Sequence, residues 1–307
     1  MDNPLVHIII LTWNHWQATA VCLHSLAQLT YPNYQIIVVD NGSSDNTSDN
    51  IRQQFPHVTL IANEQNLGFA AGCNVGLRHA FAQGADYVLL LNNDTIASAN
   101  LLDSLVQQAH TLPNVGILTP MLSYLDDPDK LWFAGSQRHP LTLEATSFGP
   151  TGPRHKRQPQ LQTVDYIFGT AMFLPTAVLR RVGLFDERFF FYYEDMDLCL
   201  RVQAAGYQLY VIPQANVQHG IAASTANFSH LRAYHKARGS VLFFRKHGRY
   251  RLPLIIPYRL ASTLRTLLRF ARQQQWPALR AYLTGLWHGL RTPITWYNTY
   301  RFPDRNR

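Results

Sequence analysis

The chain has 307 residues, of which 47% are hydrophobic and 15% are charged, as in a folded protein with one large domain or one domain and an appendage. No run of about 18 apolar residues predicts a transmembrane helix, and the amino-terminal residues lack the pattern of a signal peptide. Its net charge is +8. Its three cysteines are widely spaced, which excludes a disulfide framework or a cysteine metal site, so a cytoplasmic location is expected.

The first 120 residues alternate predicted strands with predicted helices. Continuous apolar runs predict strands over residues 5–11, 35–39, 58–61, 87–91 and 115–118. The segments between them predict helices over residues 16–29, 47–54, 69–83 and 101–110. Strands that are apolar on both faces and alternate with helices are typical of a mainly parallel, covered sheet. The predicted fold class is therefore α/β and Rossmann-like.

The middle of the chain is less regular. Residues 121–163 show no clear period, and the Gly- and Pro-rich stretch 149–157 predicts a loop. Order returns near residue 165, with a short helix predicted over 176–182. A further helix opens within 186–197 and ends at Gly206, before a strand over 207–212.

The last part of the chain differs in charge. Residues 229–307 hold 16 of the 27 Lys and Arg but one of the 19 Asp and Glu. We expect a catalytic domain over 1–228 and a basic helical region over 229–307, with helices near 231–246, 254–272 and 279–291. The last of these predicts an apolar face of Leu279, Tyr282, Leu283, Leu286, Trp287 and Leu290, opposite Arg280, Thr284, His288 and Arg291.

Two interpretations of these helices are open. They either pack on the catalytic domain or attach it to a membrane surface, and aromatic and arginine side chains together favour an anionic membrane. Nucleic acid is a third partner for a basic segment. Because the aromatic residues lie at helical spacing, they predict an apolar face rather than a base-stacking platform. We therefore expect a membrane partner and no nucleic acid.

Three polar clusters follow predicted strands: residues 12–14, 40–43 and 92–94. Ligands of open α/β sheets bind beyond the carboxyl ends of the strands, so these clusters predict a binding site. Ordinary loop polarity is the alternative for each. The Asp40 carboxylate suits a base or a ribose, or else it caps its own turn.

The small residues of segment 66–76 stand at the start of a predicted helix. They permit close approach of a phosphate to the helix N-terminus, or simply tight packing of the helix on the sheet. The segment lacks the GxGxxG spacing, so it does not indicate dinucleotide binding.

Four residues predict a metal site and a general base. Asp94 suits Mg²⁺ or Mn²⁺ shared with a diphosphate, or it caps the next helix. His219 is a competent metal ligand or a structural side chain. Glu194 and Asp195 follow five aromatic residues at a predicted helix start, where paired acids either stabilise the helix dipole or include a base with a raised pKa.

These segments together resemble a known family. The sequences TWN (12–14), VVDNGSSD (38–45), NLGFA (66–70), LNND (91–94), YED to Arg201 (193–201) and His219 are similar to inverting family 2 glycosyltransferases. The rhamnosyltransferase-like bacterial branch is the most similar. The resemblance covers roughly residues 5–245 and implies a GT-A fold with a divalent cation as cofactor.

The resemblance also implies roles. Asp40 would contact the base or ribose, and the nucleotide-sugar pocket would include Thr12, Asn14, Asn41, Asn66, Gly68, Asn74, Asn92 and Asn93. Asn92 stands where the family has the first acid of its Asp-X-Asp element, which weakens the expected metal site. Asp94 and His219 would hold the cation, and Arg201 would make a structural pair or a phosphate contact. Asp195 would be the base, with Glu194 as the alternative.

The implied reaction is inverting transfer of a hexose or deoxyhexose, rhamnose among them, from a dTDP- or UDP-linked donor. The acceptor would be a surface polysaccharide or a polyprenyl-diphosphate-linked precursor at the inner face of the plasma membrane. The alternative is a non-catalytic nucleotide-sugar-binding or scaffold protein, favoured if Asn92 abolishes metal binding.

Overall fold

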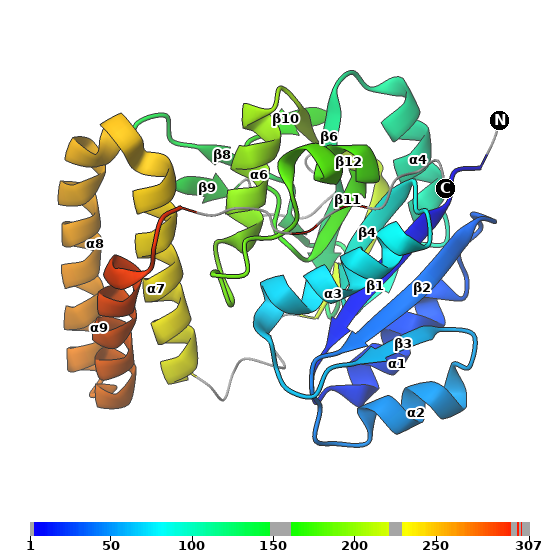
Figure 1. Cartoon of the computed structure of the whole chain (residues 1–307), viewed down its shortest axis with the longest axis horizontal. Helices are drawn as coiled ribbons and strands as arrows, with labels where there is room; N and C mark the ends of the chain where they lie inside the picture. The colour runs from blue at the N-terminus through cyan, green and yellow to red at the C-terminus, as the bar shows by residue number, and fades with distance from the viewer. Residues whose placement is uncertain (1–2, 148–160, 221–228, 296–299, 301, 303–307) are drawn as a thin grey trace.

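The structure has a layered α/β region on one side and three packed helices on the other (Figure 1). The computed structural model describes residues 3–147, 161–220, 229–295, 300 and 302. The predicted loop over 149–157 lies outside the described residues.

The amino-terminal half alternates strands with helices, as predicted. Its strands are β1 (Val6–Thr12), β2 (Tyr34–Asp40), β3 (Thr59–Ala62), β4 (Tyr87–Asn92), β5 (Thr95–Ala97) and β6 (Val115–Tyr124). Its helices are α1 (Trp16–Leu26), α2 (Thr47–Gln54), α3 (Gly68–Ala82) and α4 (Leu101–Thr111).

The middle of the chain adds short strands and returns to the same sheet. It contains β7 (Leu131–Phe133), β8 (Ser136–Arg138), β9 (Ala145–Ser147), β10 (Gln162–Val164), β11 (Ala171–Pro175), α5 (Thr176–Val182), α6 (Glu194–Ala204) and β12 (Gln208–His219). The ten-stranded sheet runs in the order β10-β12-β6-β11-β4-β1-β2-β3, with β5 and β7 paired at its side.

The sheet is mostly parallel, and both of its faces are covered. Strands β4, β1, β2 and β3 are parallel neighbours, as are β6 and β12, whereas β11 runs antiparallel between β4 and β6. Alternate residues of β1 enter different cores: Ile9 packs with α3 and α6 on one face, and Ile8 packs with α1 and α4 on the other. The α/β prediction is therefore confirmed, and its physical basis is burial on both faces.

Two boundaries differ from the sequence-based expectation. Helix α6 begins only at Glu194, because Tyr192 and Tyr193 have φ values of 73° and 75° and cannot continue a right-handed helix. Strand β12 does not end at residue 212 but runs through a register shift to His219. A register shift of this kind interrupts the apolar run and hides the strand's second half from pattern reading.

The carboxy-terminal region is helical: α7 (Ser229–Gly248), η2 (Arg249–Arg251), α8 (Leu252–Arg272) and α9 (Trp276–Arg291). Helices α7 and α9 lie against each other in Figure 1. A Cβ atom on Gly285 would lie 2.3 Å from the Tyr234 carbonyl oxygen, so the two backbones approach closely there. Among the described residues, no helix combines the length and the apolar character needed to span a bilayer.

Helix α9 buries only part of its predicted apolar face. Its buried residues are Ala278, Tyr282, Gly285 and Gly289, whereas Leu283, Trp287 and Leu290 are exposed. At Gly285 and Gly289 the neighbouring helix α7 comes too close for a leucine side chain, whereas Tyr282 is buried and Leu286 packs against this core.

Candidate active site

The sheet brings the three predicted polar clusters to one edge. Thr12, at the end of β1, is the register partner of Asp40, at the end of β2. On the other side of β1, Leu11 pairs with Asn92, at the end of β4. Parallel strands end on the same side, so the clusters that follow β1, β2 and β4 share the carboxyl edge of the sheet.

Asp40 organises the turn that follows β2. Its side chain is 2% exposed, and one carboxylate oxygen accepts a hydrogen bond from the Ser43 backbone N–H at 3.0 Å. The other oxygen accepts a hydrogen bond from the Ser48 hydroxyl. The structure therefore contains the turn-capping arrangement that was one interpretation of Asp40, while its contact with a nucleotide stays a prediction.

Asn14 joins the loops that follow β1 and β2. It has a φ of 51°, a conformation that Asn tolerates better than most residues. Its backbone N–H donates to the Ser43 hydroxyl at 2.8 Å, and its side-chain oxygen accepts from the Ser44 N–H at 2.7 Å. These bonds fix one wall of the predicted nucleotide pocket.

Asn93 joins the end of β4 to β1 and α1. Its amide nitrogen donates to the hydroxyls of Thr12 at 3.2 Å and Thr19 at 3.0 Å, and the two hydroxyls lie 2.8 Å apart. Thr19 belongs to this cluster although no sequence pattern selects it, because one hydroxyl on a helix carries no periodic signal.

Asn41 and Asn66 hold the start of α3 against the end of β2. The Asn41 amide donates to Asn66 Oδ1 at 3.0 Å and to the Gly68 carbonyl at 3.1 Å, and its oxygen accepts from Asn63. Gly68 has a φ of +82°, and a Cβ there would lie 2.5 Å from the Phe190 carbonyl oxygen. The small residues predicted for close approach thus serve protein packing in this structure.

Asn74 lies on α3, buried and fully bonded. Its amide nitrogen donates to the Phe185 carbonyl and the Glu187 carboxylate, both at 2.9 Å, and its oxygen accepts from the Phe185 N–H at 3.0 Å. The structure therefore shows Asn74 fastening the segment that precedes α6, and a contact with the sugar nucleotide remains a prediction.

Asp94 and His219 meet although 125 positions separate them. Asp94 lies in the turn between β4 and β5, so it does not cap the next helix, α4. His219 ends β12, which pairs with β5, and its Nε2 lies 3.2 Å from Asp94 Oδ1. The Trp132 ring packs on the imidazole with centroids 4.5 Å apart, and this contact orients His219.

This pair suits one hard divalent cation. Two ligands at right angles on an octahedral ion, each about 2.1 Å from it, lie about 3 Å apart, close to the separation observed here. No group of three or more His, Cys, Asp or Glu placed to hold a metal occurs in the described part of the chain. Asp94 and His219 are therefore candidate ligands, and Mg²⁺ or Mn²⁺ would take the others from water and substrate phosphate.

The backbone of Gly169 and Thr170 links Asp195 to the carboxyl edge of the sheet. Its carboxylate accepts hydrogen bonds from the Gly169 N–H at 3.0 Å and the Met196 N–H at 2.7 Å. The residue after Gly169 is Thr170, and its carbonyl oxygen accepts a hydrogen bond from the Asn92 N–H at 2.9 Å. Asp195 therefore sits one backbone segment away from the end of β4 and the turn that carries Asp94.

The neighbouring acids differ in their surroundings. Burial raises the pKa of Asp195, but the backbone N–H groups of Gly169 and Met196 favour its ionised form. Burial and the adjacent carboxylate raise the pKa of Glu194 well above its ordinary value, and its Oε2 has no hydrogen-bond partner in the described structure. The ionised form is therefore better stabilised at Asp195, through its backbone N–H partners, than at Glu194.

Behind these acids lies a buried ion-pair network. Asp197 bonds Arg201 at 2.8 Å, Lys246 at 2.6 Å and His247 at 2.7 Å. Burial opposes its ionisation, but these cations outweigh burial and hold its pKa well below the ordinary range. Lys246 also bonds Asp186 at 2.8 Å. Arg201 is therefore a structural partner in this structure, as one of its two predicted roles required.

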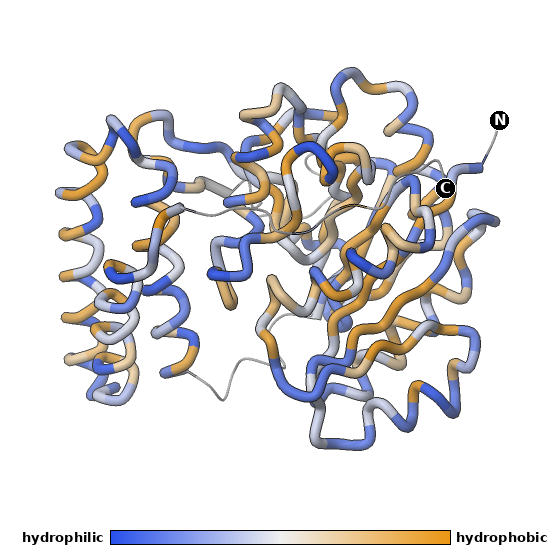
Figure 2. Tube along the Cα trace, viewed as in Figure 1, coloured by the Kyte–Doolittle hydropathy of each residue, from blue (hydrophilic) through white to orange (hydrophobic). Residues whose placement is uncertain are grey.

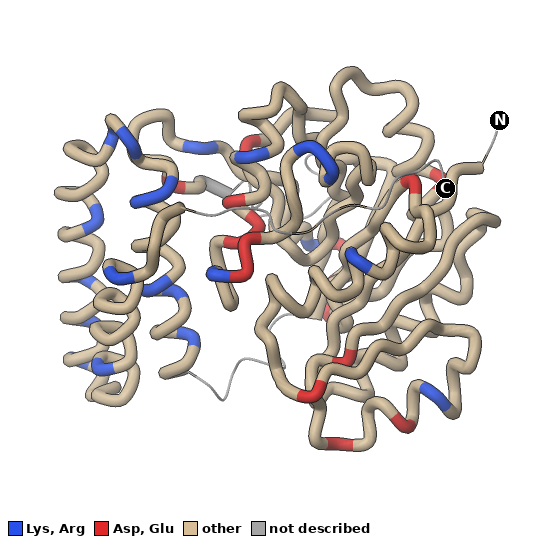
Figure 3. The backbone as a smooth tube through the Cα atoms, viewed as in Figure 1, with Lys and Arg blue, Asp and Glu red and all other residues tan. Residues whose placement is uncertain are grey.

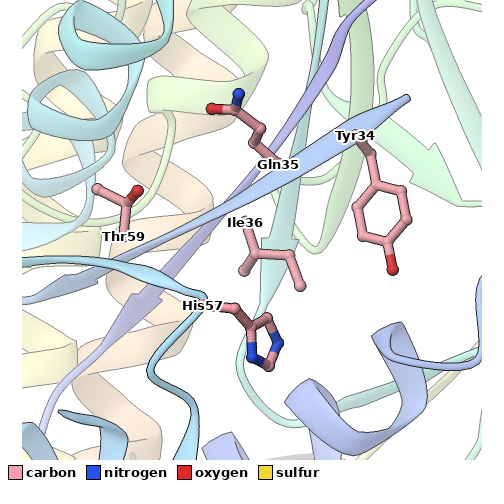
Figure 4. Close-up of a pocket in the computed structure, with 5 residues that line it drawn as sticks. All are labelled: Tyr34, Gln35, Ile36, His57 and Thr59. Atoms are coloured by element: carbon pink, nitrogen blue, oxygen red, sulfur yellow. The ribbon is translucent and has the colours of Figure 1, made fainter. Parts of the chain in front are cut away.

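A separate pocket of about 290 Å³ lies away from this edge (Figure 4). It is lined by Tyr34, Gln35, Ile36, His57 and Thr59. Tyr34 begins β2 and Asp40 ends it, so the pocket lies about 20 Å along the strand from the predicted nucleotide site. It adds nothing to the clusters at the carboxyl edge.

Comparison with known proteins identifies the family. The model of glycosyl transferase family 2 matches residues 7–180, more than half of the chain. The chain belongs to glycosyltransferase family 2. The matched residues contain the ends of β1, β2 and β4, whereas Asp195 and His219 lie beyond them.

Relatives of this glycosyltransferase include two bacterial rhamnosyltransferases. An N-acetylglucosaminyl-diphospho-decaprenol L-rhamnosyltransferase of Mycobacterium tuberculosis is 29% identical over 288 residues, covering 87% of this chain and 93% of the relative. A dTDP-rhamnosyl transferase of Shigella flexneri is 25% identical over 288 residues, covering 89% and 90%. The similarity in both cases extends over most of the chain.

Solved structures show the same fold. GalNAc-T7 with UDP, GalNAc and Mn²⁺ has a TM-score of 0.62 at 14% identity, covering 80% of this chain and 48% of its own. A Pyrobaculum calidifontis mannosyltransferase with GDP-Man and Mn²⁺ has a TM-score of 0.57 at 17% identity, covering 95% and 76%. The predicted GT-A fold is confirmed by these likenesses.

Sequence reasoning missed three contributors to the site of this glycosyltransferase. Trp132 packs on His219, Gly169 binds the Asp195 carboxylate, and Thr19 completes the hydroxyl cluster. Gly169 and Thr170 directly precede a buried apolar strand, which is a weak signal that the sequence does contain. Trp132 has no such signal because only the fold pairs both β7 and β12 with β6 and so brings the Trp132 and His219 rings together.

Proposed function

We propose that this glycosyltransferase transfers a hexose or deoxyhexose, with inversion, from a nucleoside-diphosphate sugar to a hydroxyl of a lipid-linked or polysaccharide acceptor. The observation that carries the proposal is the meeting of Asp40, the Asp94–His219 pair and Asp195 around one sheet edge. The names of the two rhamnosyltransferase relatives make dTDP-rhamnose the first donor to test and a UDP-sugar the second.

In this proposal the donor lies along the ends of β1, β2 and β4. Asp40 accepts a hydrogen bond from the ribose or base, and Thr12, Asn14 and Asn93 line the same pocket. Asp94 and His219 hold Mg²⁺ or Mn²⁺, which supplies charge neutralisation on the departing diphosphate. The presence of Mn²⁺ in the two solved structures supports a divalent cation here.

The proposed base is Asp195. Inversion requires one carboxylate beside the acceptor hydroxyl, which attacks the anomeric carbon as its proton passes to the base. Asp195 is available for this proton because two backbone N–H groups stabilise its ionised form. Glu194 is the alternative, because burial and the adjacent Asp195 carboxylate raise its pKa and favour its protonated form.

Location follows from the proposed acceptor. A polyprenyl-diphosphate-linked acceptor lies in a bilayer, so we place the enzyme at the inner face of the plasma membrane, with residues 229–307 as the attached region. Donor chemistry then remains in the catalytic domain over residues 1–228. No role for nucleic acid is proposed.

The test is a calorimetric titration of UDP, dTDP, GDP and CDP, each with and without Mn²⁺. One diphosphate should bind with a strong dependence on Mn²⁺, and Asp94→Ala should weaken that binding by about 100-fold, because one of two protein ligands is lost. Asp126→Ala, which removes an exposed acid, is the matched control and should bind normally. Failure of all four diphosphates to bind would overturn the proposal.

Asn92 supports a second candidate, a nucleotide-sugar-binding protein without turnover. An amide at this position supplies no negative charge to a cation, so the site has one carboxylate fewer than an Asp-X-Asp element. Tight donor binding with no sugar transfer and no donor hydrolysis would favour this second function.

A further inference from the structure

Helix α8 carries an exposed apolar row. Ile256, Leu260, Leu264 and Leu268 recur every four residues and are between 46% and 64% exposed. Four-residue spacing places side chains on one side of a helix. Only Ile255 of α8 is buried among the residues described. Most of this helix therefore faces outward, although its apolar residues would suit a covered surface.

Helix α9 extends the same pattern. Trp276, Leu283, Trp287 and Leu290 are between 45% and 56% exposed, and spacings of seven, four and three residues keep them on one side. The opposite side packs its small residues against α7. Figure 2 shows hydrophobic and hydrophilic positions alternating along both helices.

The charge on these two helices has one sign. Residues 229–295 contain no Asp or Glu, so no carboxylate within α8 or α9 can pair with their arginines. Exposed Arg265, Arg269 and Arg272 follow the leucine row of α8, and exposed Arg280 and Arg291 flank the tryptophans of α9. Figure 3 shows Lys and Arg positions along this part of the molecule.

Other cations of the region serve the fold. Arg259 bonds Glu144 at 2.7 Å, and Lys246 bonds Asp186 and Asp197. Arg245 donates to the Gly289 and Thr292 carbonyls. The basic residues thus divide into an inward set, which joins the helices of the bundle to one another and to the α/β region, and an outward set beside the apolar rows.

We propose that the outer surface of α8 and α9 binds an anionic lipid bilayer, with both helices lying in the plane of the interface. The leucine and tryptophan side chains enter the acyl boundary, and the flanking arginines pair with anionic headgroups. This inference rests on the proposed function only in that a lipid-linked acceptor gives the enzyme a reason to be there. It adds which residues enter the bilayer and which lipid charge they select.

Two other partners, a second copy of this chain and a nucleic acid, do not fit the outer surface of α8 and α9. A second copy of this surface would join two identical patches that carry arginines and no carboxylate, so no ion pair could offset the repulsion of their charges. A nucleic acid would need cations along the centre of the surface to meet phosphates, and the centre is a row of leucines. An anionic bilayer complements both the apolar rows and the cations beside them.

The bundle also fixes the distance between bilayer and catalytic site. Arg188 donates to the Pro293 and Thr295 carbonyls beyond α9 and bonds Asp186 at 2.5 Å. Arg238 of α7 donates to the Arg188 carbonyl at 2.6 Å. Because Asp186 and Arg188 directly precede α6, the helix that carries Asp195, docking of α8 and α9 would set the height of the base above the membrane.

The experiment is co-sedimentation of the full chain with vesicles of phosphatidylcholine alone or mixed with phosphatidylglycerol. Wild type should bind the mixed vesicles strongly and the neutral ones weakly. Leu264→Gln with Leu268→Gln should weaken binding about 100-fold, since burying each leucine contributes about tenfold or more. Arg265→Gln with Arg269→Gln should weaken it about 25-fold, because each arginine contributes about fivefold.

Matched controls are Leu141→Gln and Arg52→Gln, which change an exposed leucine and an exposed arginine of the α/β region. Both should bind as wild type does, and every variant should keep its melting temperature and its Mn²⁺-dependent diphosphate binding. That last readout separates failure of this surface from failure of the proposed function. Absence of binding to mixed vesicles, equal binding to both vesicles, or a dimer that the leucine variants dissociate would overturn the inference.

Discussion

The α/β region and the carboxy-terminal bundle use hydrophobic residues in opposite ways. In the α/β region the strands bury their apolar residues on both faces, and polar groups collect at one edge of the sheet. In the bundle, small residues form the close contact between α7 and α9, and a row of large apolar residues on α8 and α9 is exposed, although Leu242, Phe243 and Phe244 of α7 are buried. Residues 1–228 are net acidic and residues 229–307 strongly basic.

This difference shows that hydrophobic pattern alone does not define a core. Leucines at helical spacing mark an inward face in α4 but an outward face in α8. What separates the two cases is the partner surface, since α4 lies on a sheet and α8 lies at the outside of the bundle (Figure 1). Lys246 of α7 joins the two regions, because it forms ion pairs with the buried carboxylates of Asp186 and Asp197 in the α/β region.

The largest effect is expected from a substitution that removes the ion pairs between the two regions. Lys246→Met leaves Asp186 and Asp197, both 0% exposed, without a shared cation. Loss of one partner from a buried network costs about 3–5 kcal/mol, so the free energy of unfolding should fall by that amount in urea titrations. Lys130→Met, an exposed control beside Tyr124, should change it by less than about 1 kcal/mol. Equal effects would mean that the network does not join the regions.

Asp195→Asn tests whether the α/β region alone performs the chemistry. The amide cannot accept the acceptor proton, so kcat should fall by about 100- to 1000-fold. The calorimetric affinity for the donor diphosphate should stay near wild type. Asp49→Asn, on the exposed surface of α2, should leave kcat unchanged. A near-wild-type rate for Asp195→Asn would refute its role as base.

Gly285→Ala sharpens the description of the bundle. Alanine favours helices over glycine, yet its Cβ would lie 2.3 Å from the Tyr234 carbonyl oxygen. The forced separation of α7 and α9 should lower the free energy of unfolding by about 2 kcal/mol. Thr284→Ala, exposed on the same helix, should have little effect. A stabilising Gly285→Ala would show that the helices separate at no cost.

Glu194→Gln gives the smallest effect and depends on pH. The pKa of Glu194 in the folded state is raised well above its ordinary value of 4.5. In the pH window that begins at this ordinary value and ends at the raised pKa, the folded state therefore holds a proton that the unfolded state has lost. Wild type therefore loses stability as pH rises through this window, by about 1.4 kcal/mol per pH unit. The glutamine variant does not titrate there, and its stability relative to wild type should rise with pH.

The measurement is the melting temperature of wild type and of Glu194→Gln as the pH is raised from the ordinary pKa of a glutamate upward. Asp49→Asn, which changes an exposed carboxylate of α2, serves as the matched control. A difference between Glu194→Gln and wild type that does not change with pH would contradict a protonated Glu194.

Most of the α/β region could be predicted from the sequence because its signals are local. Buried parallel strands give continuous apolar runs, and the polar residues that end β1, β2 and β4 follow those runs directly. Helix α6 and the second half of β12 were placed less well. The left-handed backbone of Tyr192 and Tyr193 and the register shift after Ile212 depend on packing that no local pattern records.

The sequence by itself determined the alternation of strands and helices, the three polar strand ends and the charge difference between the regions. Only the tertiary structure decided that His219 meets Asp94, that Gly169 holds the Asp195 carboxylate and that α9 packs through its glycines. Periodicity and turn residues act over a few positions of the chain. Contacts between distant segments depend on how the sheet orders its strands and on which helix face comes too close for a large side chain.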